Sequence, residues 1–395
     1  MKISNIPTEN KEVPKAKKKL LIATDTYYPK KDGVLIFLEK VVPALTDEYD
    51  ITIVAPVFDK GKFRQIGDAK VVGFPVSEKL KMADYNSVKI SKKNINRLKQ
   101  LISEADIIWS QDLAFLGALS IYYGKKYKKP VFNYIHQVTW EHFVNVLFTS
   151  KLLKKTLSFT VRRAVKSLYN KCSVLMVPYP DLARELESRN IGSRKVIIPL
   201  GVDTNEFKPP EDKYLAKRKV GFDPKTRIIG YCGRISREKD LMTLKRAYLR
   251  LLEEYKDIGL LIVGSGPEEE MNKLRSLPNV KITGFVNNVV PYLQAMDIFV
   301  MPSLTETTSL ATLEAMACKL AVVTTKVGYI KEYIIHKYNG LFFGKQNDYI
   351  LRKRLGLLLN DPGTAQMLGN NARKTVEQKF SWDNTIKNIK KALSI

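Results

Sequence analysis

Two cations follow a predicted strand early in the second half of the chain. Residues 227–232 (RIIGYC) run into Gly233 and Arg234, and Lys239 lies five residues further on. A glycine lets the backbone come close to a ligand, and Arg and Lys side chains bind phosphate oxygens. The segment therefore predicts a contact to a diphosphate. Two surface cations at a helix start are the commoner origin of such a pair, so the cations alone do not decide the matter.

A second turn, Gly264-Ser265-Gly266-Pro267, joins another predicted strand to a helix. Glycine-rich turns at this place bind phosphates in many nucleotide-binding folds. An ordinary strand-to-helix connection has the same composition, so this turn adds little when it stands alone.

Two glutamates flank a predicted helix start in the segment LTETTSLATLEAMAC. Glu306 lies before the helix, Ser309 is a good N-cap residue, and Glu314 lies inside the helix. The free N–H groups and positive dipole of a helix start suit phosphate oxygens, and carboxylates accept hydrogen bonds from sugar hydroxyls. With the cations of the first segment, these residues predict a nucleotide-sugar site.

The elements that must position these residues alternate along the chain. Helical patterns lie between short apolar strands, for example at 35–45 and 94–103, and they close the chain at 348–359, 362–379 and 382–394. This alternation indicates parallel sheets covered on both faces. We expect an α/β protein with two doubly wound, Rossmann-like domains facing a central cleft and joined near 200–222. The predicted strands are 19–24, 51–55, 70–74, 107–110, 131–135, 173–178, 227–232, 259–263, 280–283, 297–301, 320–324 and 341–343.

The composition bounds the class of protein. Of 395 residues, 45% are hydrophobic, which excludes a disordered or fibrous chain. The sequence shows neither the long apolar run of a spanning helix nor the apolar core of a secretory signal. Cys172, Cys232 and Cys318 lie far apart and form no disulfide or zinc pattern. We therefore expect a soluble protein of a reducing compartment.

The net charge of +26 is unusually high for a protein of this length. Residues 1–200 hold 35 basic and 19 acidic residues. Such an excess implies nucleic acid, an anionic membrane or phosphorylated small molecules as a partner, unless it serves solubility alone. The segment 148–172 has seven basic residues and no acidic one. As a helix it places apolar residues on one side and Lys151, Lys155, Arg162 and Lys166 on the other. This helix either lies on an anionic membrane or packs its apolar stripe on the sheet.

Taken together, the motifs resemble the retaining glycosyltransferases of family 4, which have the two-domain GT-B fold. The resemblance covers nearly all of the chain after residue 17, and its strongest part is the glutamate–seven residues–glutamate motif of Glu306 and Glu314. The other matching segments are Gly233-Arg234 with Glu238-Lys239, Gly201-Val202-Asp203 with Phe207, Asp32-Gly33-Val34, and Phe380-Ser381-Trp382.

The resemblance implies a role for each matching residue. Arg234 and Lys239 would bind the donor diphosphate and stabilise the charge that grows on it. Glu314 would hold the ribose hydroxyls, Glu306 would contact the transferred sugar, and His136 matches a histidine beside that sugar. The predicted catalytic residues are His136, Arg234, Lys239 and Glu306, and the further donor contacts are Gly33, Gly233, Gly264, Gly284, Ser309, Leu310 and Glu314.

The resemblance also implies a division into domains. We expect a disordered basic tail at 1–17, an acceptor domain at 18–200 and a donor domain at 201–380. The helix 381–395 would cross back and close the acceptor domain. In this family the leaving diphosphate is thought to assist deprotonation of the acceptor on the same face, and no metal or other cofactor is required.

This chain departs from many members of that family near the donor sugar. It has Thr307, Ser309 and Lys319 where they have glycine, and Gly328-Tyr329 where they have two glycines. The reduced backbone freedom leaves the identity of the sugar open. The Thr-Glu-Thr form around Glu306 resembles members that glycosylate lipids.

The sequence thus predicts a hexosyltransferase that uses a nucleotide sugar, a UDP-sugar before others, and a membrane lipid acceptor such as a glycerolipid. We expect it to be cytoplasmic and peripheral on the membrane, with an anionic membrane surface and no nucleic acid as partner. The alternatives are transfer to a polyprenol-linked or soluble glycan, a nucleotide-sugar epimerase of the same fold, and a basic nucleic-acid-binding protein.

Overall fold

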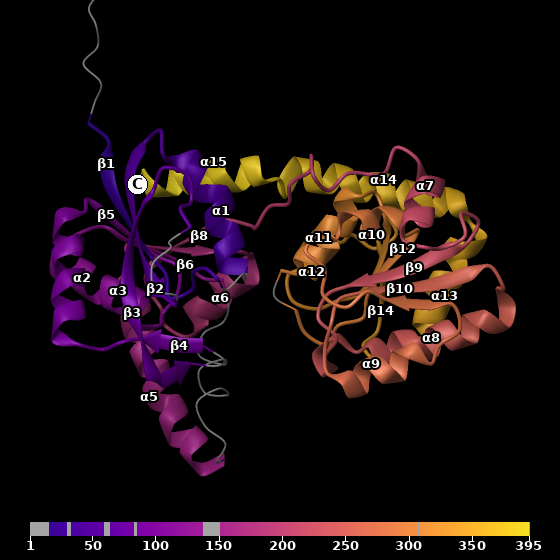
Figure 1. Ribbon diagram of the computed structural model, residues 1–395, viewed down its shortest axis with the longest axis horizontal. Helices are drawn as coiled ribbons and strands as arrows, with labels where there is room; N and C mark the ends of the chain where they lie inside the picture. Colours follow the sequence, from indigo (N-terminus) through magenta and orange to yellow (C-terminus); the bar gives the residue numbers. More distant parts are fainter. Residues whose placement is uncertain are drawn as a thin grey trace, which may run out of the picture. The chain divides into compact units, whose positions relative to one another are not determined.

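The structure of the protein is a computed structural model that describes residues 16–29, 33–58, 64–82, 85–136, 151–306 and 308–394 (Figure 1). For residues 78–82, 85–86 and 151–158 the description is confined to the backbone. The chain divides into two compact units, which are treated separately. The first unit is Met1–Met176 with Leu186–Val196, and the second is Val177–Glu185 with Ile197–Ile395.

The sheet of the first unit has the strand order β4-β3-β2-β1-β5-β6-β7-β8. The pairs from β3 across to β7 are parallel, and β3 with β4 is antiparallel. The strands are β1 Lys18–Ala23, β2 Tyr49–Val57, β3 Lys70–Met82, β4 Tyr85–Val88, β5 Ile107–Ser110, β6 Val131–Tyr134, β7 Val174–Val177 and β8 Arg194–Ile197. The helices are α1 Gly33–Leu45, α2 Lys92–Glu104, α3 Phe115–Lys126 and α5 Lys151–Tyr169. The helix α6 Pro180–Ser188 is divided between the units after Glu185.

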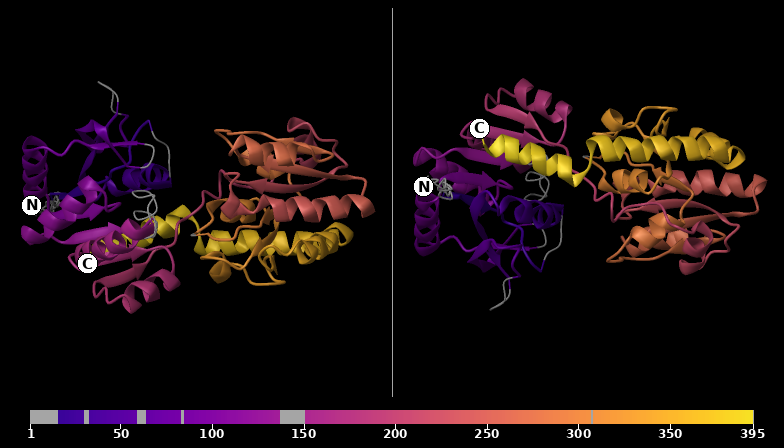
Figure 2. Two further views of the ribbon diagram at one scale, coloured as in Figure 1. Left: turned by 90° about the horizontal axis from the view of Figure 1, so that it is seen from below. Right: turned by 90° about the horizontal axis from the view of Figure 1, so that it is seen from above.

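The sheet of the second unit is parallel throughout, with the order β11-β10-β9-β12-β13-β14. Figure 2 shows this sheet lying between helices. Its strands are β9 Arg227–Cys232, β10 Ile258–Val263, β11 Val280–Ile282, β12 Ile298–Met301, β13 Ala321–Thr325 and β14 Leu341–Phe343. Its helices are α7 Lys213–Lys219, α8 Leu241–Glu254, α9 Glu268–Arg275, α10 Val290–Ala295, α11 Leu310–Ala317, α12 Ile330–Tyr333, α13 Asp348–Asn360, α14 Pro362–Lys379 and α15 Trp382–Leu393.

Burial explains why the apolar runs were recognisable as strands. β5, β6, β12 and β13 are buried along their whole length, as parallel strands covered on both faces should be. The predicted strands 107–110, 227–232 and 341–343 coincide with β5, β9 and β14. The analysis missed β4 and β8, and it ended β3 too early. β4 (YNSV) and the half-exposed β8 (RKVI) lack the continuous apolar run on which the prediction relied.

Each sheet reverses its strand order at one point. In the first unit the reversal lies between β1 and β5, and in the second between β9 and β12. In open α/β sheets, ligands bind beyond the carboxyl ends of the strands at such a point, because the connecting loops there turn to opposite sides. The loops after β9 and β12 hold Arg234, Lys239 and Glu306.

The C-terminal helix α15 belongs to the second unit by its contacts. Ser381 forms a backbone bridge with Val202, and the Thr385 hydroxyl donates a hydrogen bond to the carbonyl of Pro199 at 2.8 Å. The expected closing of the first domain by residues 381–395 stays a prediction, and residues 1–15 of the expected tail lie outside the described ranges. In those ranges, no helix has the length and apolar content that a membrane crossing requires.

Candidate functional site

The reversal point of the second unit brings a cation and a carboxylate from separate motifs together. Lys239 ends the short 3-10 turn Arg237–Lys239 after β9, and Glu306 lies in the loop after β12. The Lys239 Nζ lies 2.6 Å from Glu306 Oε1, and the two side chains are 16% and 7% exposed. A pair so shielded from water is strongly coupled, and loss of either partner leaves an uncompensated charge.

Two hydrogen bonds fix the loop that holds Glu306. The Ser303 hydroxyl donates to Glu306 Oε1 at 2.7 Å, and the Leu304 N–H donates to the carbonyl of Glu238 at 2.8 Å. The second bond joins the β12 loop to the turn that contains Lys239. Ser303 was not among the residues predicted from the sequence. Its position directly after an apolar strand and three residues before Glu306 was the available signal.

Three glycines let the ends of β9, β10 and β11 approach one another. Gly264 forms a backbone bridge with Gly284, and a Cβ on Gly264 would lie 1.9 Å from the carbonyl oxygen of Gly233. The φ angles of Gly233, Gly264 and Gly284 are 148°, 138° and 70°. Other residues rarely adopt these angles. The predicted glycines are therefore required by the backbone, whether or not a ligand lies against them.

The helix α11 begins at Leu310, after Ser309 in the left-handed conformation with φ 54°. The Ser309 hydroxyl lies 2.8 Å from the Thr312 hydroxyl and makes no cap to a backbone N–H, so the expected capping role is wrong. Among the described residues, the N–H groups of Leu310 and Ala311 have no acceptor. Two free donors at a helix start form a suitable anion contact.

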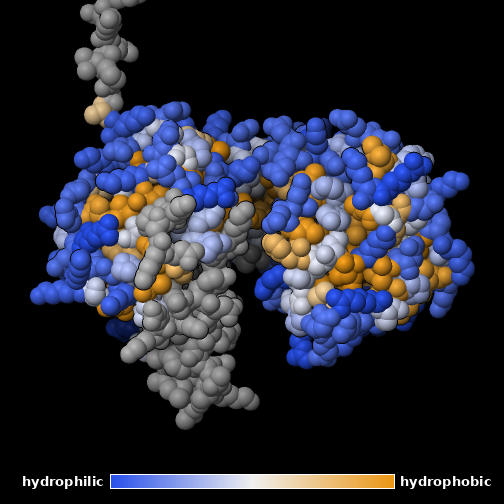
Figure 3. Space-filling model, viewed as in Figure 1, coloured by the Kyte–Doolittle hydropathy of each residue, from blue (hydrophilic) through white to orange (hydrophobic). Residues whose placement is uncertain are grey.

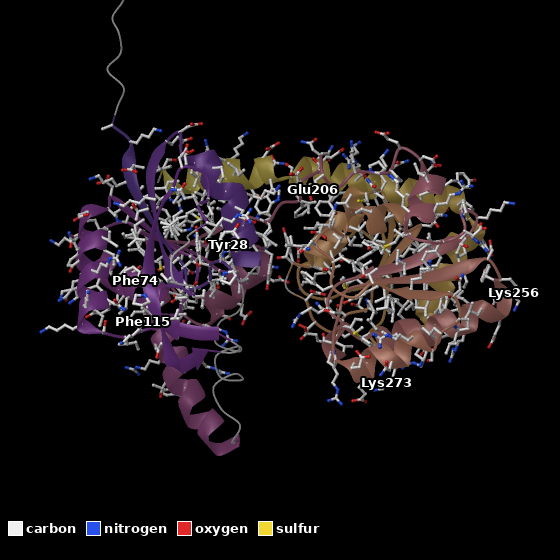
Figure 4. All side chains as sticks on the ribbon, in the orientation of Figure 1. Tyr28, Phe74, Phe115, Glu206, Lys256 and Lys273 are labelled. Atoms are coloured by element: carbon white, nitrogen blue, oxygen red, sulfur yellow. The ribbon has the colours of Figure 1, made fainter. Side chains whose placement is uncertain are left out.

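Glu314 lies in α11, close to the end of β9. Burial, together with a smaller effect of the negative charge of Glu206, raises the pKa of the Glu314 carboxyl to about 7. Glu206, labelled in Figure 4, belongs to the connection after Gly201. The charge of Glu314 in turn contributes to the raised pKa of Cys232, the last residue of β9. The ribose carboxylate that the sequence predicts is thus half protonated near neutral pH in the absence of ligand.

Arg234 pairs with Glu238 and not with Glu306. Its side chain is 79% exposed, and Nη2 lies 2.8 Å from Glu238 Oε1. An exposed pair one helical turn apart contributes little to stability. The structure therefore leaves Arg234 free of strong constraints, and its diphosphate contact stays a prediction.

In the first unit, His136 follows β6 and is held among aromatic rings. Its ring centroid lies 4.9 Å from that of Phe37 and 4.6 Å from that of Tyr134, and Nε2 lies 3.0 Å from Gln111 Oε1. Burial lowers the pKa of His136 to about 3, so the ring is neutral at physiological pH. The sequence analysis missed Gln111. Gly33 begins α1, and a Cβ there would meet nothing within 4 Å, so packing does not explain this glycine.

Two carboxyl groups meet at the strand reversal of the first unit. Asp25 follows β1 and accepts hydrogen bonds from the N–H groups of Leu116 and Gly117 at 2.9 and 3.0 Å. Asp112 follows β5 and accepts from the Asp25 N–H at 2.8 Å. Burial raises the pKa of both, and for Asp112 the adjacent Asp25 charge raises the pKa well above its usual value. Asp25 thus holds the start of α3.

Asp112→Asn is expected to stabilise the protein at neutral pH. Folding raises the pKa of Asp112. The wild type therefore loses stability as the pH rises from about 4, the pKa of this carboxyl in the unfolded chain, through its higher pKa in the folded protein. Asparagine has no such proton to lose and can donate to Asp25. The difference in melting temperature should be small at pH 4 and grow as the pH rises to 8. A difference in melting temperature that is constant with pH would contradict the raised pKa of Asp112 in the folded protein.

The helix α5 includes the basic positions predicted to face a membrane. Val165 and Tyr169 are buried, whereas Arg162 is exposed and Phe159 is 69% exposed. Of the predicted apolar stripe, Val165 is thus buried, Val161 and Leu168 are half-buried, and Ala164 is exposed. The backbone at Lys151 and Lys155 is helical, but their side chains lie outside the described part. Figure 3 shows hydrophilic residues interspersed with hydrophobic ones on one face of the molecule.

Lys319 occupies a position that favours glycine. Its N–H donates to the carbonyl of Met316 at 3.0 Å, and the Leu320 N–H donates to that of Ala315 at 3.1 Å. These two bonds form a Schellman cap at the end of α11, which places Lys319 in the left-handed conformation with φ 61°. The structure thus explains two of the departures from the family glycines, Ser309 and Lys319, as strained residues. Thr307 lies outside the described ranges.

Lys319→Gly should raise the free energy of unfolding by about 0.5–1 kcal/mol, because glycine adopts this conformation without the Cβ penalty. Urea denaturation would measure the change. Lys319→Ala removes the same side chain and keeps the strain, so it serves as the control and should show no gain. An equal gain in both variants would mean that the lysine side chain, and not the backbone, is responsible.

Two family models match successive parts of the chain. Residues 32–206 match the family described as Glycosyltransferase Family 4, and residues 212–375 match the Glycosyl transferases group 1. An alpha-monoglucosyldiacylglycerol synthase of Acholeplasma laidlawii is 23% identical over 371 residues, which cover 89% of this chain and 90% of that protein. An uncharacterised glycosyltransferase of Methanocaldococcus jannaschii is 31% identical over 56% of this chain and 59% of its own length.

Solved structures with the same fold cover nearly the whole chain. HepE of Anabaena in complex with UDP has a TM-score of 0.73 at 20% identity and covers 95% of this chain and 99% of its own. The sucrose-phosphate synthase of Thermosynechococcus elongatus has a TM-score of 0.74 at 18% identity and covers 95% and 98%. These likenesses confirm the predicted GT-B fold class.

Proposed function

Since the chain belongs to the family 4, group 1 glycosyltransferases, we propose that it transfers a hexose from a UDP-sugar to a membrane lipid such as a glycerolipid, with retention of configuration. The donor half of this proposal rests on one observation. Lys239, Glu306 and the start of α11 meet at the strand reversal of the second unit, where α/β sheets bind nucleotides.

Each residue of this centre fits one part of a nucleotide sugar. Lys239 and Arg234 offer positive charge to the diphosphate, whose negative charge grows as the glycosidic bond breaks. The N–H groups of Leu310 and Ala311, which have no acceptor among the described residues, offer further donors to phosphate oxygens. Glu314 accepts hydrogen bonds from the ribose, and Glu306 from the hexose. His136 is neutral, so it can serve as a hydrogen-bond partner of the sugar without adding charge.

Two comparisons favour UDP and a lipid among the possible substrates. The structure of HepE contains UDP, and the relative in Acholeplasma laidlawii bears the name of a glycolipid synthase. The excess of positive charge in residues 1–200 suits acceptors embedded in an anionic membrane. We propose that the protein is cytoplasmic and binds the membrane surface peripherally through α5.

The proposed reaction uses no metal ion or other cofactor, because the cations of the chain neutralise the diphosphate. Activity should therefore survive an excess of EDTA. A loss of activity that Mg²⁺ restores would contradict this part of the proposal.

A product assay tests the proposed reaction directly. The protein would be incubated with UDP-glucose, UDP-galactose or GDP-mannose and with vesicles that contain diacylglycerol, and both nucleotide release and glycolipid would be measured. The proposal predicts glycolipid formation from a UDP-sugar. If the sugar were transferred only to a polyprenol-linked or soluble glycan, the proposed lipid acceptor would be wrong. Conversion of the donor without any acceptor would indicate an epimerase.

Charge reversal on α5 tests the membrane contact. Changing Lys151, Lys155, Arg162 and Lys166 to Glu should abolish sedimentation with phosphatidylglycerol vesicles, since each basic residue near an anionic surface contributes about 1 kcal/mol. UDP binding should be unchanged. The control reverses four exposed lysines of the second unit, Lys256, Lys345, Lys374 and Lys379, and so has the same net charge. An equal loss of vesicle binding in both variants would show that net charge, and not α5, attracts the protein to the membrane. Duplex DNA serves as a competing ligand in the same assay.

A further inference from the structure

We propose that Ser303 is a positioning residue for Glu306. The buried hydroxyl of Ser303 fixes Oε1 of the Glu306 carboxylate, so that Oε2 faces the donor sugar. This inference rests on the proposed function, in which Glu306 contacts the transferred hexose. It assigns a function to a residue that lies outside the glutamate motif.

The Ser303 side chain has one strong acceptor in reach. Ser303 is fully buried, and its Oγ lies 2.7 Å from Glu306 Oε1 and 3.2 Å from the Met301 sulfur, which is a weak acceptor. A carboxylate oxygen only accepts, so the hydroxyl must donate to it. A hydrogen bond to a charged acceptor is about twice as strong as one between neutral groups. The serine hydroxyl is therefore committed to Glu306.

Ser303 is itself held from the neighbouring strand. The hydroxyl of Thr325, at the end of β13, donates to the Ser303 carbonyl at 2.6 Å, and Thr325 is also fully buried. Two buried hydroxyls thus connect the end of β13 to the backbone of Ser303 and then to the carboxylate. This chain of hydrogen bonds restricts where the loop after β12 can place Glu306.

Both partners of Glu306 lie on the same oxygen. Ser303 Oγ and Lys239 Nζ approach Oε1 at 2.7 and 2.6 Å, while no described residue has a hydrogen bond to Oε2. A carboxylate with one oxygen fully occupied cannot rotate without losing both contacts. Its second oxygen then stays available for a sugar hydroxyl. A group held in this way needs no reorganisation during the reaction, which is the condition for effective electrostatic catalysis.

Lys239 alone would hold the carboxylate less well. A lysine ammonium has three rotatable donors on a flexible stem, so it accepts several orientations of its partner. The short serine side chain has one donor, and the carboxylate of Glu306 is the stronger of the two acceptors within its reach. Ser303 therefore determines the orientation of Glu306, and Lys239 determines its charge balance.

The test compares Ser303→Ala with the wild type in two measurements. Affinity for UDP, which lacks the hexose, should change by no more than about twofold, because Ser303 does not touch the nucleotide. The kcat for UDP-glucose turnover should fall about tenfold to hundredfold, which corresponds to the loss of one hydrogen bond to a charged group. A structural role alone would lower the two quantities together.

Thr324→Val is the matched control. Thr324 is fully buried in the same strand as Thr325, and its hydroxyl donates to the carbonyl of Met301 at 3.0 Å. The substitution removes a buried hydroxyl bond next to the site without touching Glu306. Its melting temperature should fall about as much as that of Ser303→Ala, while its kcat should remain that of the wild type.

A double-mutant cycle then tests the route of the effect. In a Glu306→Gln background, adding Ser303→Ala should lower kcat by less than about threefold, because the group that Ser303 orients is already lost. A full additional loss would overturn the proposal, and so would a Ser303→Ala variant with wild-type kcat. If the wild type neither binds UDP nor turns over UDP-glucose, the proposed function fails and the positioning role fails with it.

Discussion

Lys239→Ala is expected to weaken UDP binding at least tenfold and to lower kcat/KM about 10²- to 10³-fold, the range found when one charge-stabilising donor is removed from an active site. Lys239 is the most constrained cation at the strand reversal of the second unit. It touches Glu306 at 2.6 Å and lies beside the loop that leads to α11. The exposed Arg234 can compensate in part, because both cations would face the same diphosphate.

The same change should also destabilise the protein. Glu306 is 7% exposed and would lose its cation, a loss that costs about 3 kcal/mol at buried ion pairs. A separate variant distinguishes unfolding from loss of function. Lys239→Met with Glu306→Gln removes both charges, so it should regain most of the melting temperature and none of the activity.

A charge-matched control is available in the same unit. Lys256, labelled in Figure 4, is an exposed lysine near the end of α8. Lys256→Ala should leave UDP affinity and turnover unchanged. Equal effects of Lys239→Ala and Lys256→Ala would mean that only the overall charge of the second unit matters.

Glu314 should make donor binding depend on pH near neutrality. Its carboxyl has a pKa of about 7, and only the ionised form accepts hydrogen bonds from both ribose hydroxyls. Affinity for UDP-glucose should therefore rise about tenfold between pH 6 and pH 8, as the ionised fraction rises through the pKa. Both phosphates of UDP-glucose are diesters that do not titrate between pH 6 and pH 8. UDP-glucose is therefore a better ligand than UDP for this measurement.

Glu314→Gln provides the control for that pH dependence. Glutamine keeps the shape of the side chain but cannot ionise, so its affinity should be low and equal at pH 6 and pH 8. A loss of about tenfold to hundredfold at pH 8 is expected for a hydrogen bond to a charged group. His136 does not interfere, because burial keeps its pKa at about 3. A pH dependence that persists in Glu314→Gln would assign the titration to another group.

The sequence predicted the parts of the site that depend on strand ends, and it missed those that depend on tertiary packing. Apolar runs such as 227–232 place Gly233 and the residues after it at the carboxyl edge of a sheet, and the glutamate motif locates a helix start. These patterns are local, so they remain visible in a single sequence. They do not show which of two nearby cations reaches the carboxylate. Lys239 does so, whereas Arg234 pairs with Glu238.

The missed residues have a common physical cause. Ser303 and Gln111 are buried polar residues, and each is placed by a hydrogen bond, Ser303 to Glu306 three residues along the chain and Gln111 to His136 25 residues along. No periodic pattern marks such a residue, because its position is set by one hydrogen bond and not by a face of a helix or strand. The capping role expected of Ser309 was wrong for the same reason, since its hydroxyl pairs with that of Thr312.

Calorimetric titration of UDP tests the donor site most directly. It would compare the wild type with the double variant Lys239→Met/Glu306→Gln, whose stability should be close to that of the wild type. Binding of UDP to the wild type, and binding at least tenfold weaker to the double variant, is the result we predict. Equal affinity in two equally stable proteins would contradict the assignment of the nucleotide to the strand reversal between β9 and β12.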